Sequence, residues 1–324
     1  MRTLRHTLLA ATAGIAIFAF TGCAKENSSP AKTSAPATAN DEMVLTPEGY
    51  MAKSKVHFLD EGYGLRVENG RLKKIDLRSG NMVEDFGEIK EKNASINLNR
   101  DPSASGKKND IVPEVQGWIA YTYWSNPSTS TPVTSFSTSW TVPAVPSKQS
   151  SQTIFLFNGM QDGTSSSSYI IQPVLQWGSS AAGGGKYWAV TNWYVTSSTA
   201  VYGKLVEVSP GTALTGVMKQ TAVSGSSYSY SSSFTGSAYT STNITVTGVP
   251  QAYWLAETLE SYGVTKPATE YPNQANIALT GIDILEGSTN PSITWTTAQA
   301  SNVAAPKATV VSGSSSNGTV DISF

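Results

Sequence analysis

The chain has 324 residues, a formal net charge of −1 at pH 7 and a single cysteine. One cysteine excludes an intramolecular disulfide, and a net charge near zero provides no general field that would attract nucleic acid or a membrane surface. We therefore predict no nucleic-acid partner.

The first 22 residues have the layout of an export signal. Arg2 and Arg5 precede an apolar stretch at 8–20, which is shorter than the roughly 20 apolar residues of a transmembrane helix. The segment Phe20-Thr21-Gly22-Cys23 resembles a bacterial lipobox, although Phe20 stands where that motif usually has leucine. We expect cleavage after residue 22 and lipid anchoring of the exported protein to the cell envelope through Cys23. An ordinary signal peptide, which would leave the protein secreted, is the alternative.

The composition changes sharply along the rest of the chain. Residues 23–40 are rich in Ser, Ala, Pro and Thr and are expected to form a flexible tether. Residues 41–112 hold 25 Asp, Glu, Lys and Arg side chains in 72 positions, whereas residues 113–324 hold 15 in 212. This difference predicts two separate parts.

The charged part divides into a small folded unit and a linker. Residues 41–92 contain short apolar groups, and tight turns between strands are expected at 68–71 and 78–81, where a glycine follows polar residues. Residues 93–112 contain few apolar side chains and are expected to be an exposed linker.

From residue 113 to residue 324 the chain is dominated by Ser, Thr, Gly, Val, Tyr and Trp. Short alternating segments between turn residues predict strands of about 5–8 residues. The fold class is therefore all-β, with two packed antiparallel sheets in a β-sandwich preceded by the small charged segment, and we expect a monomer. Strands are expected at 136–142, 153–157, 188–195, 201–208 and 244–247.

The residue types of this part restrict its chemistry. Both histidines, the cysteine and every arginine precede residue 113. A Ser-His-Asp triad, a Cys-His pair and a histidine-ligated zinc site are therefore impossible within the sandwich alone. If the sandwich is an enzyme, one of its nine carboxylates is the expected acid or base, and we expect no metal and no cofactor.

One glutamate and two glutamines interrupt apolar segments. Glu257 lies among large apolar residues at 252–260, where desolvation would raise its pKa and suit a general acid or base. A short helix with Glu257 facing water fits the same stretch equally well. Gln172 and Gln176 share one face of an apolar strand at 170–178, which indicates either a polar cleft or a solvated face.

These segments together resemble the glutamic peptidases, or eqolisins, a family with a concanavalin A-like β-sandwich. Residues 174–178 (Val-Leu-Gln-Trp-Gly) resemble the strand that carries the family's catalytic glutamine, and residues 252–257 (Ala-Tyr-Trp-Leu-Ala-Glu) resemble the strand that ends in its catalytic glutamate. Residues 189–194 (Ala-Val-Thr-Asn-Trp-Tyr) partly match a strand between them. The resemblance extends over residues 116–290 and keeps the family's order of segments.

Two departures affect the family's cleft. Asn192 stands where the family has a glutamate, and residues 155–159 (Phe-Leu-Phe-Asn-Gly) replace a Trp-Val-Gly-Ile-Asp run. Because both positions line that cleft, the resemblance leaves the substrate and the activity open.

The resemblance implies a glutamic-type endopeptidase that hydrolyses protein or peptide substrates at acidic pH. Glu257 would act as general base and then as acid, while Gln176 would hold the attacking water and stabilise the oxyanion. The substrate-binding residues would be Gln172, Asn192, Trp193 and Tyr194.

The charged segment and the sandwich each have an alternative interpretation. By the same resemblance, residues 41–112 would be a pro-segment that covers the cleft with Arg71, Lys73, Lys74 and Arg78; a small accessory domain is the alternative.

The sandwich itself could be a non-catalytic surface or carbohydrate-binding module, or a glycoside hydrolase that pairs Glu257 with Glu207. Geometry discriminates among these functions. A peptidase needs Gln176 and Glu257 to converge on one water, whereas side chains facing different sheets would favour a binding module.

Overall fold

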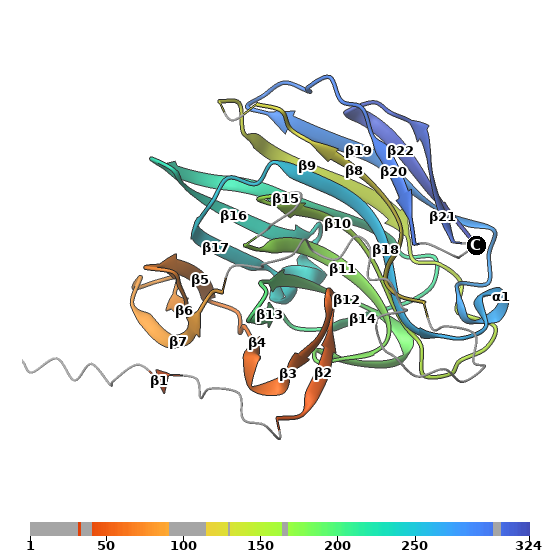
Figure 1. The fold of residues 1–324 in the computed structure, drawn as a ribbon, viewed down its shortest axis with the longest axis horizontal. Coiled ribbons are helices and arrows are strands. Elements are labelled where there is room, and N and C mark those ends of the chain that lie inside the picture. Colours follow the sequence, from red (N-terminus) through yellow and green to blue (C-terminus); the bar gives the residue numbers. More distant parts are fainter. Residues whose placement is uncertain (1–31, 34–40, 91–114, 129, 164–167, 301–305) are drawn as a thin grey trace, which may run out of the picture. The chain divides into compact units, whose positions relative to one another are not determined.

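The computed structural model of this chain describes residues 32–33, 41–90, 115–128, 130–163, 168–300 and 306–324. Strands dominate these residues and form an eleven-stranded sheet, a nine-stranded sheet and one separate hairpin (Figure 1). No helix in these ranges is long and apolar enough to cross a membrane.

The strands of the eleven-stranded sheet are, in spatial order, β1 (Lys32–Thr33), β7 (Met82–Glu88), β6 (Arg71–Asp76), β5 (Tyr63–Glu68), β17 (Ile244–Val249), β16 (Ser227–Phe234), β15 (Ala213–Ser224), β9 (Val133–Thr141), β19 (Asn276–Glu286), β22 (Ser316–Ser323) and β21 (Lys307–Ser312).

The strands of the nine-stranded sheet are, in spatial order, β20 (Thr296–Gln299), β8 (Val115–Ser125), β18 (Trp254–Val264), β10 (Thr153–Gln161), β11 (Ile170–Ser180), β12 (Gly183–Val195), β13 (Ala200–Tyr202) and β4 (Val56–Phe58), with β14 (Val206–Val208) also paired to β12. The remaining elements are the hairpin strands β2 (Met43–Thr46) and β3 (Gly49–Ala52), the 3-10 helices η1 (Lys53–Lys55) and η3 (Ser237–Thr242), and helix α1 (Pro267–Glu270).

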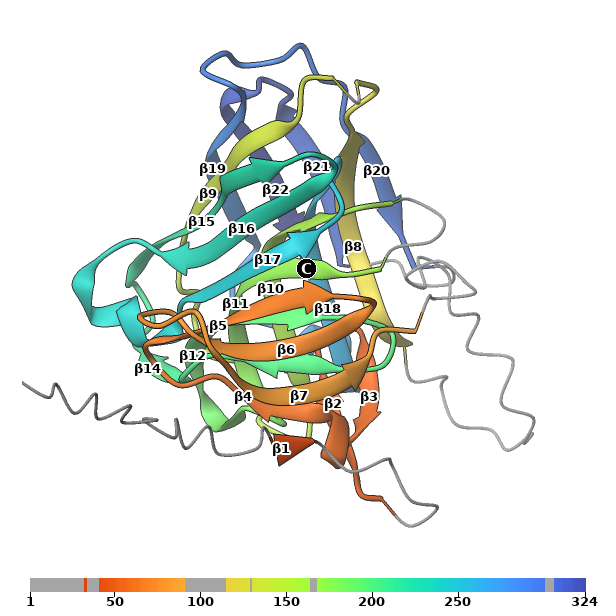
Figure 2. The ribbon, with the colours of Figure 1, turned by 90° about the vertical axis from the view of Figure 1, so that its left-hand side faces the viewer.

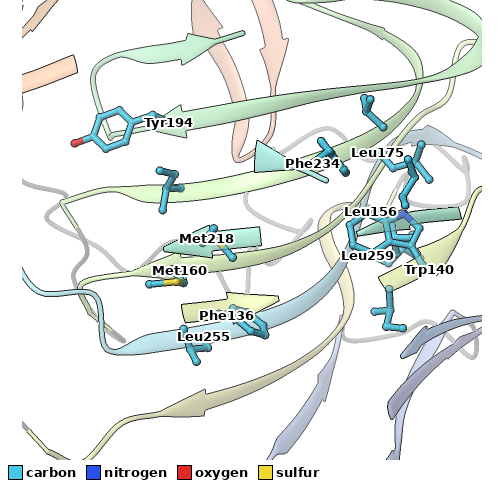
Figure 3. Packing of buried hydrophobic residues seen from close by; sticks show 14 of the residues in the cluster. Phe136, Trp140, Leu156, Met160, Leu175, Tyr194, Met218, Phe234, Leu255 and Leu259 are labelled. Atoms are coloured by element: carbon cyan, nitrogen blue, oxygen red, sulfur yellow. The ribbon is translucent and has the colours of Figure 1, made fainter. Parts of the chain in front are cut away.

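The two large sheets pack against each other around a continuous apolar core. The core contains Phe136 and Met218 from the eleven-stranded sheet and Leu156 and Leu175 from the nine-stranded sheet (Figure 3). Successive side chains of a strand point to opposite faces, so the core defines an inner face of each sheet. The prediction of an all-β sandwich with two packed sheets is confirmed.

The nine-stranded sheet carries a second apolar cluster on its other face, which we call the outer face. Phe155, Val174, Trp193 and Trp254 belong to this second cluster, and each lies next in sequence to a residue on the inner face. Strand β10 is buried at every position. Burial on both faces explains why these strands have continuous apolar runs instead of a simple alternation.

The predicted strands occur with different limits. The stretch 252–260, for which helix and strand were both open, contains the start of strand β18. The single strand predicted at 201–208 is wrong, because β13 and β14 are separate strands. Between them Gly203 passes close to another backbone: a Cβ atom there would lie 2.2 Å from the carbonyl oxygen of Thr242.

The charged N-terminal segment joins both sheets. Strand β4 pairs in parallel with β13. Strand β5 pairs in parallel with β17 (Figure 2). Both predicted turns occur; at the first, Asn69 and Gly70 have φ values of 52° and 69°, as a type I′ hairpin requires. The described residues do not include 1–22, Cys23, most of the tether or 93–112. The predicted domain limits therefore stay predictions.

Three of the four cations assigned to a pro-segment pair with acids of their own segment. Arg71 lies 2.8 Å from Asp85, Lys74 lies 3.2 Å from Asp60, and Lys73 pairs with Glu68. These pairs give the cations a local role within the N-terminal strands.

Candidate functional site

Glu257 projects from the inner face of strand β18 into the core. Its cross-strand neighbours are Asn158 of β10 and Thr122 of β8. The hydroxyl of Thr138, on β9 of the opposite sheet, donates a hydrogen bond to its Oε1 atom. The side chain is fully buried. Glu257 is therefore enclosed between the two sheets.

Burial raises the pKa of Glu257 well above its ordinary value of 4.5, and the hydrogen bond from Thr138 offsets only part of this effect. The carboxyl group is therefore protonated well beyond the pH range in which a solvated glutamate ionises. Its Oε2 atom has no hydrogen-bond partner among the described residues.

Gln176 projects from the outer face of strand β11, and its amide holds the β11–β12 turn together. Its Nε2 atom donates to the carbonyl oxygens of Gly178 at 2.8 Å and Gly183 at 2.9 Å, and its Oε1 atom accepts from the hydroxyl of Ser180 at 2.8 Å. A Cβ atom at Gly184 would lie 2.4 Å from the same Nε2 atom. These contacts give Gln176 a structural role.

The structure does not bring Gln176 and Glu257 together. Phe155 of β10 is the cross-strand partner of Gln176 and Glu260, whereas Asn158, three positions along the same strand, is the partner of Glu257. Positions an odd number apart on a strand point to opposite faces. The sheet itself therefore separates the amide from the carboxyl group, which contradicts the expected convergence on one water.

The four residues expected to bind substrate divide in the same way. Gln172 of β11 and Trp193 of β12 are cross-strand partners and share the outer face. Asn192 and Tyr194, the chain neighbours of Trp193, point to the inner face, where the amide of Asn192 donates to the hydroxyl of Thr242 at 2.8 Å. Gln172 and Trp193 therefore share the outer face, whereas Asn192 and Tyr194 share the inner face.

Buried polar atoms without hydrogen-bond partners gather on the outer face around Gln172. Within the described ranges no partner is present for either amide atom of Gln172, for the indole nitrogens of Trp193 and Trp254, for Oε1 of Gln161 or for the hydroxyl of Thr258. All five residues are 0% exposed, and they come from the adjacent strands β12, β11, β10 and β18. We call them the outer-face cluster.

Unsatisfied buried groups of this kind destabilise the folded state. Leaving a buried donor or acceptor unpaired costs about 1–3 kcal/mol, and most buried polar groups in native proteins are paired. Three members of the cluster were not predicted from the sequence: Gln161, Trp254 and Thr258. The spacing of Trp254 and Thr258 places them on one face of a strand, but the sequence does not show which strand lies beside which.

Aromatic rings surround the outer-face cluster. Tyr123 stacks on Trp254 with ring centroids 5.2 Å apart, and Trp118 lies 5.8 Å from the same indole. Tyr202 packs 5.1 Å from Trp193. The unsatisfied polar atoms therefore lie within an apolar, aromatic surface.

Carboxylates are scarce on this surface. Among the described residues of β8, β10, β11, β12 and β18, only Glu260 lies on the outer face, where it accepts hydrogen bonds from the hydroxyl of Tyr262 and from the backbone N–H of Glu48 at 2.8 Å. Glu207 of β14 is the cross-strand partner of Ala189, which in turn pairs with Gln176 on the outer face. Glu257 lies on the inner face, so the sheet also separates the two carboxylates considered for a glycoside hydrolase. The described ranges contain no group of three or more potential metal ligands.

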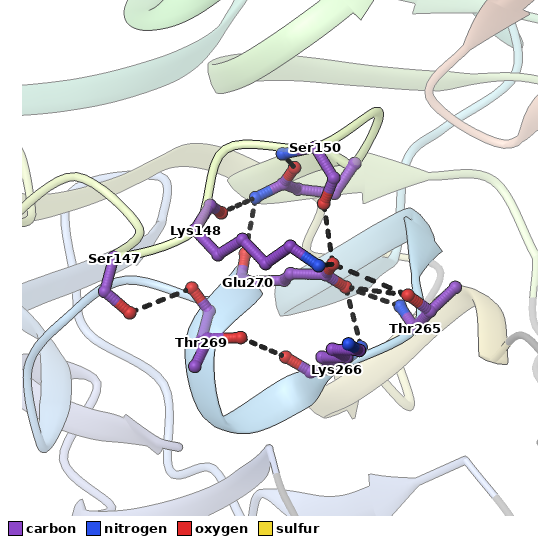
Figure 4. Close-up of polar contacts among 8 residues, drawn as sticks. Ser147, Lys148, Ser150, Thr265, Lys266, Thr269 and Glu270 are labelled. Atoms are coloured by element: carbon purple, nitrogen blue, oxygen red, sulfur yellow. Dashed lines mark hydrogen bonds and ion pairs between the residues drawn. The ribbon is translucent and has the colours of Figure 1, made fainter.

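A further buried carboxylate, Glu270 in α1, is fully engaged in hydrogen bonds (Figure 4). It accepts from the backbone N–H groups of Thr265 at 2.6 Å and Lys266 at 2.7 Å and from the hydroxyl of Ser150 at 2.6 Å; the Lys148 ammonium lies 3.8 Å away. Burial alone would raise the pKa of Glu270, but these hydrogen bonds outweigh it and hold the pKa below 4.5. This carboxylate joins the loops at 147–152 and 265–270.

No protein-family model and no curated protein sequence matches the chain. Solved structures similar to it include scytalido-glutamic peptidase with a peptide-based transition-state analogue, at 13% identity and a TM-score of 0.41, and the same peptidase with a transition-state analogue inhibitor, at 14% and 0.42. SCP-B, a member of the eqolisin family in complex with the tripeptide Ala-Ile-His, is similar at 13% and 0.40. Each similarity covers 65% of this chain and 99% of the other chain. At this level the similarity concerns the fold and assigns no activity.

Proposed function

We propose that the sandwich is a non-catalytic module that binds peptides in an extended conformation at the outer-face cluster. The observation that carries this proposal is the amide of Gln172, which is fully buried and has no hydrogen-bond partner among the described residues. A ligand that pairs with the amide would remove the cost of this unsatisfied group.

The chemistry of the cluster matches a peptide backbone. A carboxamide offers an acceptor oxygen and an NH₂ donor, and a peptide group offers the complementary N–H and C=O. The indole N–H groups of Trp193 and Trp254 supply two further donors for backbone carbonyl oxygens. The surrounding aromatic rings suit apolar ligand side chains, since aromatic residues are enriched in binding surfaces.

Titration calorimetry with unstructured decapeptides tests this proposal. We expect saturable binding that Gln172→Met weakens about tenfold or more, because the variant loses both hydrogen-bonding groups and keeps a similar shape. Equal affinity of the variant and the parent protein would contradict the proposed site. Binding of oligosaccharides instead of peptides would favour the carbohydrate-binding alternative.

A glutamic-type endopeptidase acting at acidic pH is the second candidate. Its specific support is Glu257, a carboxyl group whose pKa burial raises, which is a property of general acids. This candidate requires a rearrangement that exposes Glu257 and brings it to the face occupied by Gln176. New amino termini in an unfolded protein substrate, produced below pH 5 and lost in Glu257→Gln and Gln176→Ala, would support it.

We also propose that the protein is exported and lipid-anchored through Cys23. The support is the layout of the first 22 residues and the lipobox-like segment that ends at Cys23. Mass spectrometry of the mature amino terminus tests both steps: diacylglycerol on Cys23 is expected, and an unmodified terminus elsewhere would contradict it. The same measurement shows whether residues 41–112 are retained, which a pro-segment would not be.

A further inference from the structure

Glu48 has a backbone conformation that glutamate rarely adopts. It lies at the tip of the β2–β3 hairpin, directly after Pro47, and its φ is 81°. Glycine and asparagine are the residues that favour a positive φ at this position of a tight turn. A strained residue other than glycine points to a function for its side chain.

Both the backbone and the side chain of Glu48 contact the outer face of the nine-stranded sheet. Its N–H donates to Oε1 of Glu260 at 2.8 Å, and its Oε1 atom accepts from the indole N–H of Trp118 at 2.9 Å. Further along the hairpin, the carbonyl oxygen of Leu45 accepts from the N–H of Ala181 at 2.7 Å. The hairpin is therefore fixed to the outer face at its tip and along β2.

The hairpin lies on the outer face beside the outer-face cluster, because the ring of Trp118, which donates to Glu48, is 5.8 Å from the ring of Trp254. Leu45 belongs to the same apolar cluster as Trp193 and Trp254, and Met51 packs against it. Tyr50, the cross-strand partner of Leu45, contacts Tyr262 with ring centroids 6.0 Å apart and is 56% exposed. An isolated two-stranded hairpin is marginally stable, so contacts with the outer face hold it in place.

We propose that the β2–β3 hairpin is a latch that closes the outer face, and that Glu48 holds the latch shut. The chain after the hairpin stays attached to the sheet, because β4 pairs with β13. The tip can therefore move away while the chain stays connected. The proposal rests on the proposed function in one respect: the surface that the latch closes is the proposed peptide site, so opening and peptide binding are coupled.

Two substitutions of Glu48 test the latch. Glu48→Ala removes the acceptor for Trp118 and keeps the strained backbone, whereas Glu48→Gln keeps an acceptor oxygen at the same position and is the matched control. We expect Glu48→Ala to accelerate hydrogen exchange of the hairpin amides about tenfold and to increase acrylamide quenching of tryptophan fluorescence. Glu48→Gln should leave both close to the parent values. Slow exchange of the β10 and β11 amides in both variants will show that the sandwich stays folded.

Peptide affinity separates the latch from the proposed function. If both hold, Glu48→Ala binds decapeptides about tenfold more tightly than the parent protein, because less free energy is needed to open the latch. Unchanged hairpin exchange in Glu48→Ala, or faster exchange without increased quenching, would overturn the latch. Faster exchange and increased quenching, with no peptide binding by any form, would support the latch and contradict the peptide-binding function.

Discussion

Gln172 and Gln176 project from the same face of strand β11, but only the amide of Gln176 has hydrogen-bond partners among the described residues. Four residues apart, the two glutamines have opposite roles. Gln176 stabilises the turn that follows the strand, whereas Gln172 is unsatisfied within an aromatic surface. The chain thus provides a structural control for the proposed binding residue.

The two glutamines predict opposite effects on stability. Gln172→Met should raise the free energy of unfolding by about 1–2 kcal/mol, because it removes an unpaired buried amide. Gln176→Met should lower it by about 2–3 kcal/mol, because three hydrogen bonds are lost. Urea denaturation of both variants at neutral pH measures the difference. A loss of stability in Gln172→Met would show that its amide is satisfied and would contradict the proposed site.

Glu257→Gln should change the pH dependence of stability. The raised pKa of Glu257 means that the folded state keeps a proton that the unfolded state releases above its ordinary pKa of 4.5. The contribution of Glu257 to the free energy of unfolding is therefore fully present below pH 4.5. As the pH rises above 4.5, this contribution is lost by up to about 1.4 kcal/mol per pH unit. Glutamine cannot ionise, so the variant should gain stability over the parent between pH 4 and pH 7. A constant difference over this range would show that Glu257 ionises normally.

Glu270→Gln should have the opposite pH dependence. Because the pKa of Glu270 is lowered, its stabilising effect is present above pH 4.5 and is lost as the pH falls through the folded-state value. The variant should be less stable than the parent by about 2 kcal/mol at pH 7, and the difference should shrink towards pH 2. Urea denaturation at several pH values measures it, and an equal loss at every pH would argue against a role for the charge.

Gly184→Ala should destabilise the β11–β12 turn through a steric clash. A Cβ atom there would lie 2.2 Å from the carbonyl oxygen of Gly178, and φ at Gly184 is 105°. We expect a loss of about 3 kcal/mol. Gly211→Ala is the matched control, since φ is 87° but no atom lies within 4 Å of the added Cβ. A similar loss in both variants would assign the effect to backbone strain alone.

The sequence predicted the sandwich because turn residues and β-rich segments are local signals. The hairpin at 68–71 followed from Asn69 and Gly70, which suit the positive φ values of its turn. The pairing of β4 and β5 with strands more than 140 residues away was not predictable, because the charged composition of this segment indicated a separate unit. The apolar side chains of this N-terminal segment do not identify which sheet edge its strands join.

The candidate site was harder to predict because two signals conflicted. The alternation of Leu255, Glu257 and Leu259 places the glutamate on the face of two core leucines, which indicated a buried carboxyl group. The similarity of residues 252–257 to a catalytic strand favoured an accessible carboxyl group instead. The face of Glu257 relative to Gln176 depends on the pairing of β10 with both β11 and β18, which no single segment contains.

The most direct test of peptide binding without cleavage is to incubate the purified protein with an unfolded protein from pH 2 to pH 7. Bound substrate and new amino termini are measured in parallel for the parent, Gln172→Met, Glu257→Gln and Gln176→Ala. We predict binding that Gln172→Met abolishes or strongly weakens, with no new amino termini at any pH. New amino termini at acidic pH that disappear in Glu257→Gln and Gln176→Ala would contradict this account and establish a glutamic peptidase.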